Sequence, residues 1–211
     1  MTKAEVGTII LEDKVVAVVR LKDADLLRRA VEAIREGGVR CIEITMTIPG
    51  ALDVIKTLSA DDSLDIVVGA GTVLGAAAAE AVIEAGARFV VSPVLDEDVI
   101  RVCRSRDMFV VPGAFSPTEI VRARSAGADI VKVFPAASLG PGFFKDIKGP
   151  FPDILLMPTG GITIENARSF LDQGACCVAI GTALLDKKLI AERRWEDLVQ
   201  RARYLVESLK R

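Results

Sequence analysis

The chain has 211 residues, 51% of them hydrophobic and 27% charged, and its formal net charge is −2. It lacks the basic excess of a nucleic-acid-binding protein, and no apolar run approaches the roughly eighteen residues of a membrane span. The absence of histidine excludes Ser-His and Cys-His nucleophile pairs and imidazole-ligated metal sites. We therefore expect a single domain over residues 1–211, with neither nucleic acid nor a membrane as a partner.

Short runs rich in β-branched residues recur along the chain at intervals of roughly 20 to 26 residues, which predicts a series of strands. The eight expected strands are Val15–Val19, Cys41–Thr45, Ile66–Gly69, Phe89–Val91, Phe109–Val111, Ile130–Phe134, Ile154–Met157 and Val178–Gly181.

Helix-length segments with helical periodicity or strong helix formers separate these strands, and several of them end in glycine. The expected helices are Asp25–Glu36, Ala51–Ser59, Ala76–Ala85, Glu97–Ser105, Pro117–Ser125, Phe143–Lys148, Glu165–Gln173 and Trp195–Leu209.

Eight strand–helix units in a chain of this length predict an α/β fold, a single-domain (β/α)8 TIM barrel. The alternative is an open, doubly wound sheet. No G-x-G-x-x-G motif follows the first expected strand, and the repeat length is even throughout. Both observations favour the barrel.

A lysine interrupts the apolar run Ile130–Phe134. Because side chains alternate along a strand, Ile130, Lys132 and Phe134 share one face. Burial disfavours the charged form of an amine, so Lys132 could present a neutral nucleophile, as Schiff-base chemistry on a ketone requires. The alternative is a lysine whose stem is buried and whose ammonium group reaches water or a carboxylate.

A second charge, Glu43, lies within the expected strand Cys41–Thr45, on the face opposite to Ile42 and Ile44. Inward residues of alternate barrel strands share a layer, so Glu43 and Lys132 can meet inside the barrel. They could form a structural ion pair. Burying two ions is costly, however, so a catalytic pair explains them better.

Glycines follow the last two expected strands, in Thr159-Gly160-Gly161 and in Gly181-Thr182. Without a side chain, glycine lets backbone N–H groups approach an anion, and the loops after the last two strands are the usual phosphate site of this barrel. We therefore expect a phosphorylated or carboxylated ligand there, although a Gly-Gly pair can also serve only to make a turn.

These strand ends resemble, in the same order, those of the 2-keto-3-deoxy-6-phosphogluconate / 4-hydroxy-2-oxoglutarate aldolase family. The resemblance extends from about Val15 to Leu185. The motifs that carry it are Ile42-Glu43-Ile44-Thr45, Val68-Gly69-Ala70-Gly71-Thr72-Val73, Val91-Ser92-Pro93, Val131-Lys132-Val133-Phe134-Pro135-Ala136, Gly149-Pro150-Phe151 and Pro158-Thr159-Gly160-Gly161.

The resemblance implies a (β/α)8 barrel, a class I aldolase that needs no metal or other cofactor, and a homotrimer. It implies small-molecule substrates, pyruvate and a phosphorylated aldehyde. Lys132 would be the Schiff-base lysine and Glu43 the acid and base. By the same resemblance, Thr72, Pro93, Phe134 and Thr159 would line the pyruvyl pocket, while Gly160, Gly161, Gly181 and Thr182 would hold the phosphate.

One position departs from the family pattern. Many members have an arginine two residues after the threonine of the second-strand motif, where it binds an anionic group of the substrate; here that residue is Thr47. Arg20, at the end of the first expected strand, could supply the missing charge. The departure leaves 4-hydroxy-2-oxoglutarate and 2-keto-3-deoxy-6-phosphogalactonate open as alternative substrates.

Two other functions remain open from the residues alone. A phosphosugar isomerase or epimerase would share the barrel and the phosphate loops without requiring an imine, and the barrel could also serve as a trimeric assembly scaffold. The four cysteines show no zinc-type spacing, and Met1–Lys14 contains no apolar stretch suited to a signal peptide. We therefore expect a cytoplasmic protein.

Overall fold

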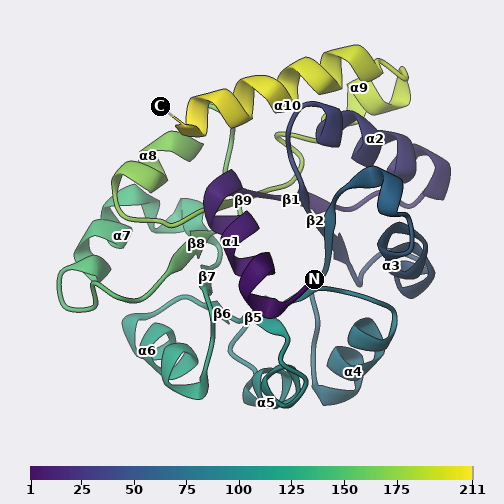
Figure 1. Ribbon diagram of the computed structural model, residues 1–211. Helices are drawn as coiled ribbons and strands as arrows, with labels where there is room; N and C mark the ends of the chain where they lie inside the picture. The colour runs from purple at the N-terminus through teal and green to yellow at the C-terminus, as the bar shows by residue number, and fades with distance from the viewer. Residues whose placement is uncertain (211) are drawn as a thin grey trace.

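The computed structural model describes residues 1–210; Arg211, the last residue of the expected domain, lies outside the described residues. Short parallel strands form a ring that helices surround (Figure 1). The strands are β1 (Val15–Val19), β2 (Cys41–Thr45), β3 (Val67–Gly71), β4 (Phe89–Val91), β5 (Phe109–Val111), β6 (Gly113–Ala114), β7 (Val131–Val133), β8 (Leu156–Pro158) and β9 (Val178–Ile180).

Two parallel sheets make up the ring, with the orders β5-β4-β3-β2-β1-β9 and β6-β7-β8. Only Pro112 separates β5 from β6, because proline has no N–H to donate to the ladder. On the other side, a parallel bridge between Thr159 and Ala179 joins β8 to β9. The two sheets therefore close on each other, as expected for a barrel and not for an open sheet.

The helices run along the outside of the strands, apart from α1. They are α1 (Lys3–Asp13), α2 (Ala24–Glu36), α3 (Ala51–Ser59), α4 (Ala76–Glu84), α5 (Glu97–Ser105), α6 (Pro117–Ala126), α7 (Gly140–Lys148), α8 (Ala167–Asp172), α9 (Lys187–Ala191) and α10 (Trp195–Lys210), with short 3-10 helices η1 (Asp62–Leu64) and η2 (Ala136–Ser138). Within residues 1–210, no helix has both the length and the apolarity to cross a membrane.

Helix α1 was not predicted from the sequence. It lies across the amino-terminal end of the strand ring (Figure 1), where Val6 and Ile10 are 1% exposed and pack on the apolar side chains inside the barrel. A capping box between Thr2 and Glu5 starts the helix, and Lys14 ends it in the left-handed conformation. The helix closes one end of the barrel, so that the opposite end is left for chemistry.

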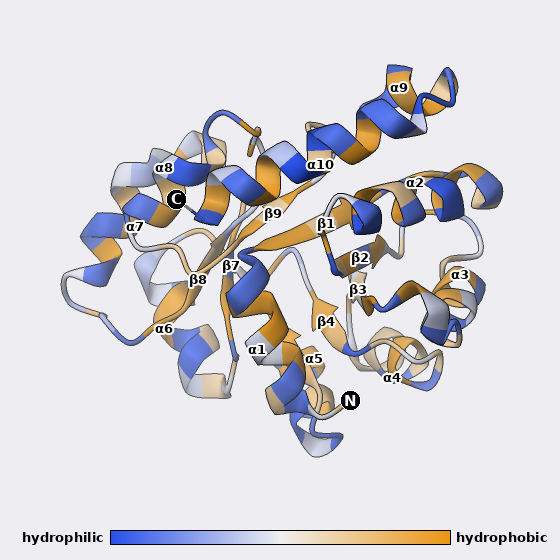
Figure 2. Ribbon diagram, turned by 45° about the horizontal axis from the view of Figure 1, so that its top comes forward, coloured by the Kyte–Doolittle hydropathy of each residue, from blue (hydrophilic) through white to orange (hydrophobic). Residues whose placement is uncertain are grey.

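Alternating side chains divide the core into two layers. Outward residues such as Ile42, Ile44 and Val133 pack between the strands and the helices, whereas inward residues such as Cys41 and Ile130 fill the barrel. Accordingly, the strands and the inner faces of the helices are hydrophobic and the outer faces hydrophilic (Figure 2). Glu43 and Lys132 thus share their faces with inward residues, as the alternation predicted.

The predicted elements agree with the observed ones to within a few residues. The expected strand Ile130–Phe134 is shorter in the structure, which has β7 over Val131–Val133, and the expected helix Glu165–Gln173 is shortened to α8. Helix α9 was not predicted either. Its five residues span little more than one helical turn, and such a short segment gives no clear periodicity.

Candidate active site

Glu43 lies on β2 with its side chain inside the barrel, where the residue is 1% exposed. On the neighbouring strand β3, Gly71 lies opposite Thr45, two residues beyond Glu43. Because Gly71 has no side chain, it leaves room for the Glu43 carboxylate. Among the described residues, no group hydrogen-bonds to Glu43 Oε2. Burial raises the pKa of Glu43, and the positive charges of Lys132 and Arg20 oppose this shift. Glu43 therefore binds a proton more tightly than an exposed glutamate does.

Lys132 lies on β7 and is 5% exposed. Its backbone N–H donates to the Pro112 carbonyl over 2.9 Å, which fixes the strand next to the break between β5 and β6. Its Nζ is 5.2 Å from the centroid of the Phe134 ring. A buried primary amine, an aromatic ring and a carboxylate whose pKa responds to the amine are therefore brought together at the carboxyl ends of the strands.

A pocket of about 310 Å3 opens beside this cluster, over the ends of β1, β8 and β9. Phe134 belongs to both regions, because its ring faces Lys132 Nζ and also lines the pocket. Thr159 is 7% exposed, and its Oγ1 has no hydrogen-bond partner within residues 1–210. The lining consists of Val18, Arg20, Phe134, Thr159, Gly160, Gly161, Ile162, Thr163, Ala179, Gly181, Thr182 and Ala183.

The far end of this pocket suits an anion. Arg20 is exposed, and its guanidinium takes no part in the salt bridges formed within residues 1–210. The backbone N–H groups of Gly161, Thr182 and Ala183 also donate to no carbonyl within residues 1–210. Gly161 has a φ of 76°, a conformation that glycine adopts without strain. One cation and several free N–H donors therefore line a pocket that contains no acidic side chain.

Five of the predicted site residues lie outside the lining of this pocket: Glu43 and Lys132, which lie beside it, and Thr47, Thr72 and Pro93. Thr72 follows β3 with a φ of 59°, an uncommon conformation for a β-branched residue, and Pro93 follows β4 and packs against Gly113. Thr47 is exposed, and its hydroxyl hydrogen-bonds to that of Thr45 over 3.1 Å. The structure therefore brings Arg20, and not Thr47, together with the glycine loops.

Sequence reasoning missed several lining residues, including Ile162, Thr163 and Ala183. Thr163 and Asn166 hold the loop after β8, because the Asn166 carboxamide accepts from the Thr163 N–H over 2.8 Å and donates to the Gly161 carbonyl over 3.0 Å. The spacing Thr-x-x-Asn at the start of a helix was the available signal. No such sequence pattern pointed to Ala183 as a lining residue.

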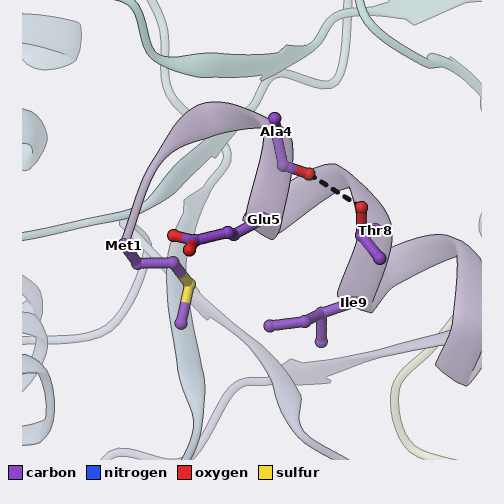
Figure 3. A pocket seen from close by; sticks show the side chains of 5 residues that line it. All are labelled: Met1, Ala4, Glu5, Thr8 and Ile9. Atoms are coloured by element: carbon purple, nitrogen blue, oxygen red, sulfur yellow. Dashed lines mark hydrogen bonds between the residues drawn. The ribbon is translucent and has the colours of Figure 1, made fainter.

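A second hollow, of about 570 Å3, lies on the outer surface of α1, at Met1, Ala4, Glu5, Thr8 and Ile9 (Figure 3). Its polar groups are already occupied. The Glu5 carboxylate accepts from the Thr2 N–H over 2.6 Å, and the Thr8 hydroxyl donates to the Ala4 carbonyl over 3.0 Å. Since these side-chain groups bond within α1 and its cap, and the hollow holds neither of the two buried charges, we do not assign the active site to it.

No group of three His, Cys, Asp or Glu side chains within residues 1–210 is arranged to hold a metal ion.

Comparisons with known proteins agree with this geometry. The family model for KDPG and KHG aldolases matches residues 6–201. A 2-dehydro-3-deoxy-phosphogluconate aldolase of Haemophilus influenzae is 32% identical over 200 residues, which cover 94% of each protein.

Two solved structures are also similar. One is a KDPG aldolase of Legionella pneumophila with pyruvate captured as a covalent carbinolamine intermediate; it has a TM-score of 0.87 and 27% identity and covers 94% of this chain and 97% of that chain. The other is a cube-shaped protein cage designed by fusing symmetric oligomeric domains, with a TM-score of 0.84 and 28% identity, covering 93% of this chain and 72% of that chain.

Proposed function

Because this chain belongs to the KDPG and KHG aldolase family, we propose that it cleaves 2-keto-3-deoxy-6-phosphogluconate reversibly to pyruvate and glyceraldehyde 3-phosphate. The family assignment makes the chain a carbon–carbon lyase of the class I, Schiff-base type. The observation that carries the proposal is the buried amine of Lys132 beside Glu43 and the Phe134 ring, next to a pocket built for an anion.

In the proposed mechanism, the neutral amine of Lys132 adds to the C2 ketone of the substrate. The carbinolamine that forms loses water to give a protonated imine. The positive imine nitrogen accepts the electron pair of the C3–C4 bond, so the bond can break without a metal ion. The covalent carbinolamine in the related Legionella pneumophila enzyme supports this first step.

Glu43 is the proposed acid and base. As the C3–C4 bond opens, its carboxylate removes the proton of the C4 hydroxyl, directly or through a water molecule, and the aldehyde leaves. Protonation of the remaining enamine at C3 gives the pyruvyl imine, and hydrolysis then releases pyruvate and regenerates Lys132. Burial, which raises the pKa of Glu43, suits a group that must hold this proton between the two steps.

Two further groups of residues complete the proposed substrate site. Thr72, Pro93, Phe134 and Thr159 contact the pyruvyl part, and the unpartnered Oγ1 of Thr159 is available to the substrate carboxylate. The phosphate lies against Gly160, Gly161, Gly181 and Thr182, with Arg20 supplying the charge that is missing at Thr47.

The anion pocket favours a phosphorylated substrate over 4-hydroxy-2-oxoglutarate, because the distal carboxylate of the latter is bonded directly to C4, whereas the phosphate of 2-keto-3-deoxy-6-phosphogluconate lies farther along the chain, on C6. Glycine N–H donors and one arginine make no contact that depends on the configuration at C4. For this reason 2-keto-3-deoxy-6-phosphogalactonate is the second candidate, and a relative from Rhizobium meliloti that is 32% identical is described as a probable aldolase for that compound.

The assembly we propose is a homotrimer. Leu74, Val94 and Phe115 follow β3, β4 and β6 and are 56%, 52% and 44% exposed, so neighbouring copies could cover them. The cage built from symmetric oligomeric domains supports an oligomer for proteins of this fold. Light scattering would measure the assembly size.

The location we propose is the cytoplasm. The four cysteines form no disulfide within residues 1–210, consistent with that reducing compartment.

Pyruvate release tests the proposed reaction. Lactate dehydrogenase and NADH would report the rate with 2-keto-3-deoxy-6-phosphogluconate, its C4 epimer 2-keto-3-deoxy-6-phosphogalactonate, and 4-hydroxy-2-oxoglutarate. We expect the highest kcat/KM with the first substrate. A preference for the unphosphorylated acid would contradict the substrate assignment, and failure to release pyruvate from all three would contradict the lyase reaction itself.

A further inference from the structure

The turn that follows β9 is anchored by an arginine from the last helix. Arg201 on α10 is half-buried, and its Nε donates to the Ala183 carbonyl over 2.7 Å. Ala183 lines the anion pocket together with Gly181 and Thr182, whereas Arg201 itself does not. The arginine therefore contacts the turn from the side away from the pocket.

This contact fixes the peptide group between Ala183 and Leu184. Its carbonyl accepts from Arg201, and its N–H donates to the Gly181 carbonyl over 3.0 Å; the Leu185 N–H donates to the same carbonyl, also over 3.0 Å. Hydrogen bonds therefore hold both the carbonyl and the N–H of this peptide group. The preceding N–H groups, those of Thr182 and Ala183, donate to no carbonyl within residues 1–210.

The charge of Arg201 also acts on two carboxylates, one in each of the loops that follow β8 and β9. Hydrogen bonds from the Glu165 N–H and from Thr163 lower the pKa of Glu165, in the loop after β8, and the charge of Arg201 adds to this shift. Backbone hydrogen bonds likewise lower the pKa of Asp186, in the turn after β9, and Arg201 again adds to the shift. Asp186 in turn accepts from the Lys188 and Leu189 N–H groups at the start of α9. The charge of Arg201 therefore acts on both loops that contribute glycines to the pocket, while its hydrogen bond holds the turn after β9.

We propose that Arg201 is a positioning residue for the phosphate end of the substrate, which holds the Gly181–Ala183 turn so that the Thr182 and Ala183 N–H groups can bind the anion. This inference rests on the proposed aldolase function and assigns a role to a residue that does not itself touch the ligand. An arginine that only fastened α10 to the barrel would affect stability and leave the choice between substrates unchanged.

The test compares Arg201→Gln with Arg201→Lys, which keeps a charged donor. For Arg201→Gln we expect the KM for 2-keto-3-deoxy-6-phosphogluconate to rise about tenfold, as the loss of a charged hydrogen bond implies. The KM for 4-hydroxy-2-oxoglutarate should change by less than about twofold, because that substrate lacks the phosphate. The kcat with either substrate should also change by less than about twofold. The Arg201→Lys variant should recover most of the loss. Arg203→Ala, an exposed position on the same helix, is the matched control and should behave as wild type.

Isothermal titration calorimetry with inorganic phosphate tests the role of Arg201 independently of the proposed reaction. We expect Arg201→Gln to weaken phosphate binding by a similar factor, whether or not the wild type proves to be an aldolase. If the wild type releases no pyruvate, the proposed function fails and phosphate binding alone decides the role of Arg201. Equal KM changes for both substrates, or unchanged phosphate binding in Arg201→Gln, would overturn the inference, as would a wild type that binds no phosphate. Thermal unfolding of each variant identifies a simple loss of folding, and in that case the Arg201→Lys variant gives the answer.

Discussion

The Glu43 carboxylate occupies the space in which a side chain on Gly71 would stand. A Cβ built on Gly71 overlaps the Oε1, Cδ and Cγ atoms of Glu43. The two residues lie on neighbouring strands, β2 and β3, and both face into the barrel. The absence of a side chain at position 71 thus allows a carboxylate to lie inside the barrel close to Lys132.

Replacing Gly71 with alanine should therefore move the carboxylate away from the reacting atoms. Gly71 does not have a positive φ, so the added methyl group acts through contact and not through backbone strain. We expect kcat to fall by about 100-fold, since a displacement of about 1 Å in a catalytic group has effects of this size. Imine formation on Lys132 should persist. Gly142→Ala is the control, because a Cβ there meets no atom within 4 Å; equal activity in the two variants would contradict the prediction.

The Glu43→Gln variant tests the proposed acid and base directly. The amide keeps the shape of the side chain but cannot take up the C4 hydroxyl proton, so turnover should fall by about 100- to 10,000-fold while the imine still forms. Pyruvate release and borohydride trapping measure the two steps separately. Glu36→Gln, an exposed change at the end of α2, should retain full activity. If Glu43→Gln lost less than about threefold, far under the usual range for an acid–base group, the residue would be structural.

The same substitution should remove a pH dependence of stability that Glu43 gives the wild type, and the direction of that dependence is defined. Burial raises the pKa of Glu43 in the folded protein, whereas in the unfolded chain a glutamate titrates near ~4.3. The proton therefore stabilises the fold fully below that pH, and this contribution is lost as the pH rises through the higher folded pKa. Glutamine does not titrate. In urea unfolding, the free energy of unfolding of Glu43→Gln relative to wild type should increase as the pH rises above about 4, the pKa of an unfolded glutamate; a constant or falling difference would show that burial does not control this carboxyl.

Lys132 should be the residue that reacts with pyruvate. Treatment with pyruvate and borohydride should add one reduced pyruvyl group, and mass spectrometry should find it on the Lys132 peptide, because this lysine is buried beside Glu43 and Phe134. Lys132→Met should show neither labelling nor turnover. Lys145→Met removes an exposed lysine from α7 and should show both. Labelling of a different lysine in the wild type would contradict the mechanism.

The strands and the two buried charges could be predicted from the sequence because they follow from local rules. Alternation along Cys41–Thr45 and Ile130–Phe134 placed Glu43 and Lys132 on inward faces, and the structure shows Cys41 and Ile130 inside the barrel as well. The ends of β1 and β2 were located to the residue, which is why Arg20 and Thr47 could be compared at all.

Features that depend on contacts distant in sequence could not be predicted in this way. The apolar residues of α1 that are buried, Val6 and Ile10, pack on the barrel interior, and the only local signal was the Thr2–Glu5 capping box. Likewise, Arg201 lies eighteen residues from Ala183, and only the packing of α10 on the barrel brings them together. The left-handed backbone of Thr72 is an exception to residue preference that no pattern announces.

The last prediction concerns the charge that binds the substrate phosphate. Gly161 is a poor place to test it, because a side chain there would overlap Ala137 and would have to adopt a φ of 76°. Arg20→Gln removes the charge and keeps the size of the side chain. We expect the KM for 2-keto-3-deoxy-6-phosphogluconate to rise at least about tenfold, the usual cost of one charged hydrogen bond, with little change for 4-hydroxy-2-oxoglutarate. Lys22→Gln, an exposed change in the same loop but outside the pocket lining, controls for the loss of a nearby positive charge. If both substrates bound Arg20→Gln equally poorly, Arg20 would act either on the C1 carboxylate that the substrates share or on Glu43, whose raised pKa it opposes. In that case no residue would replace the arginine missing at Thr47 in binding the phosphate.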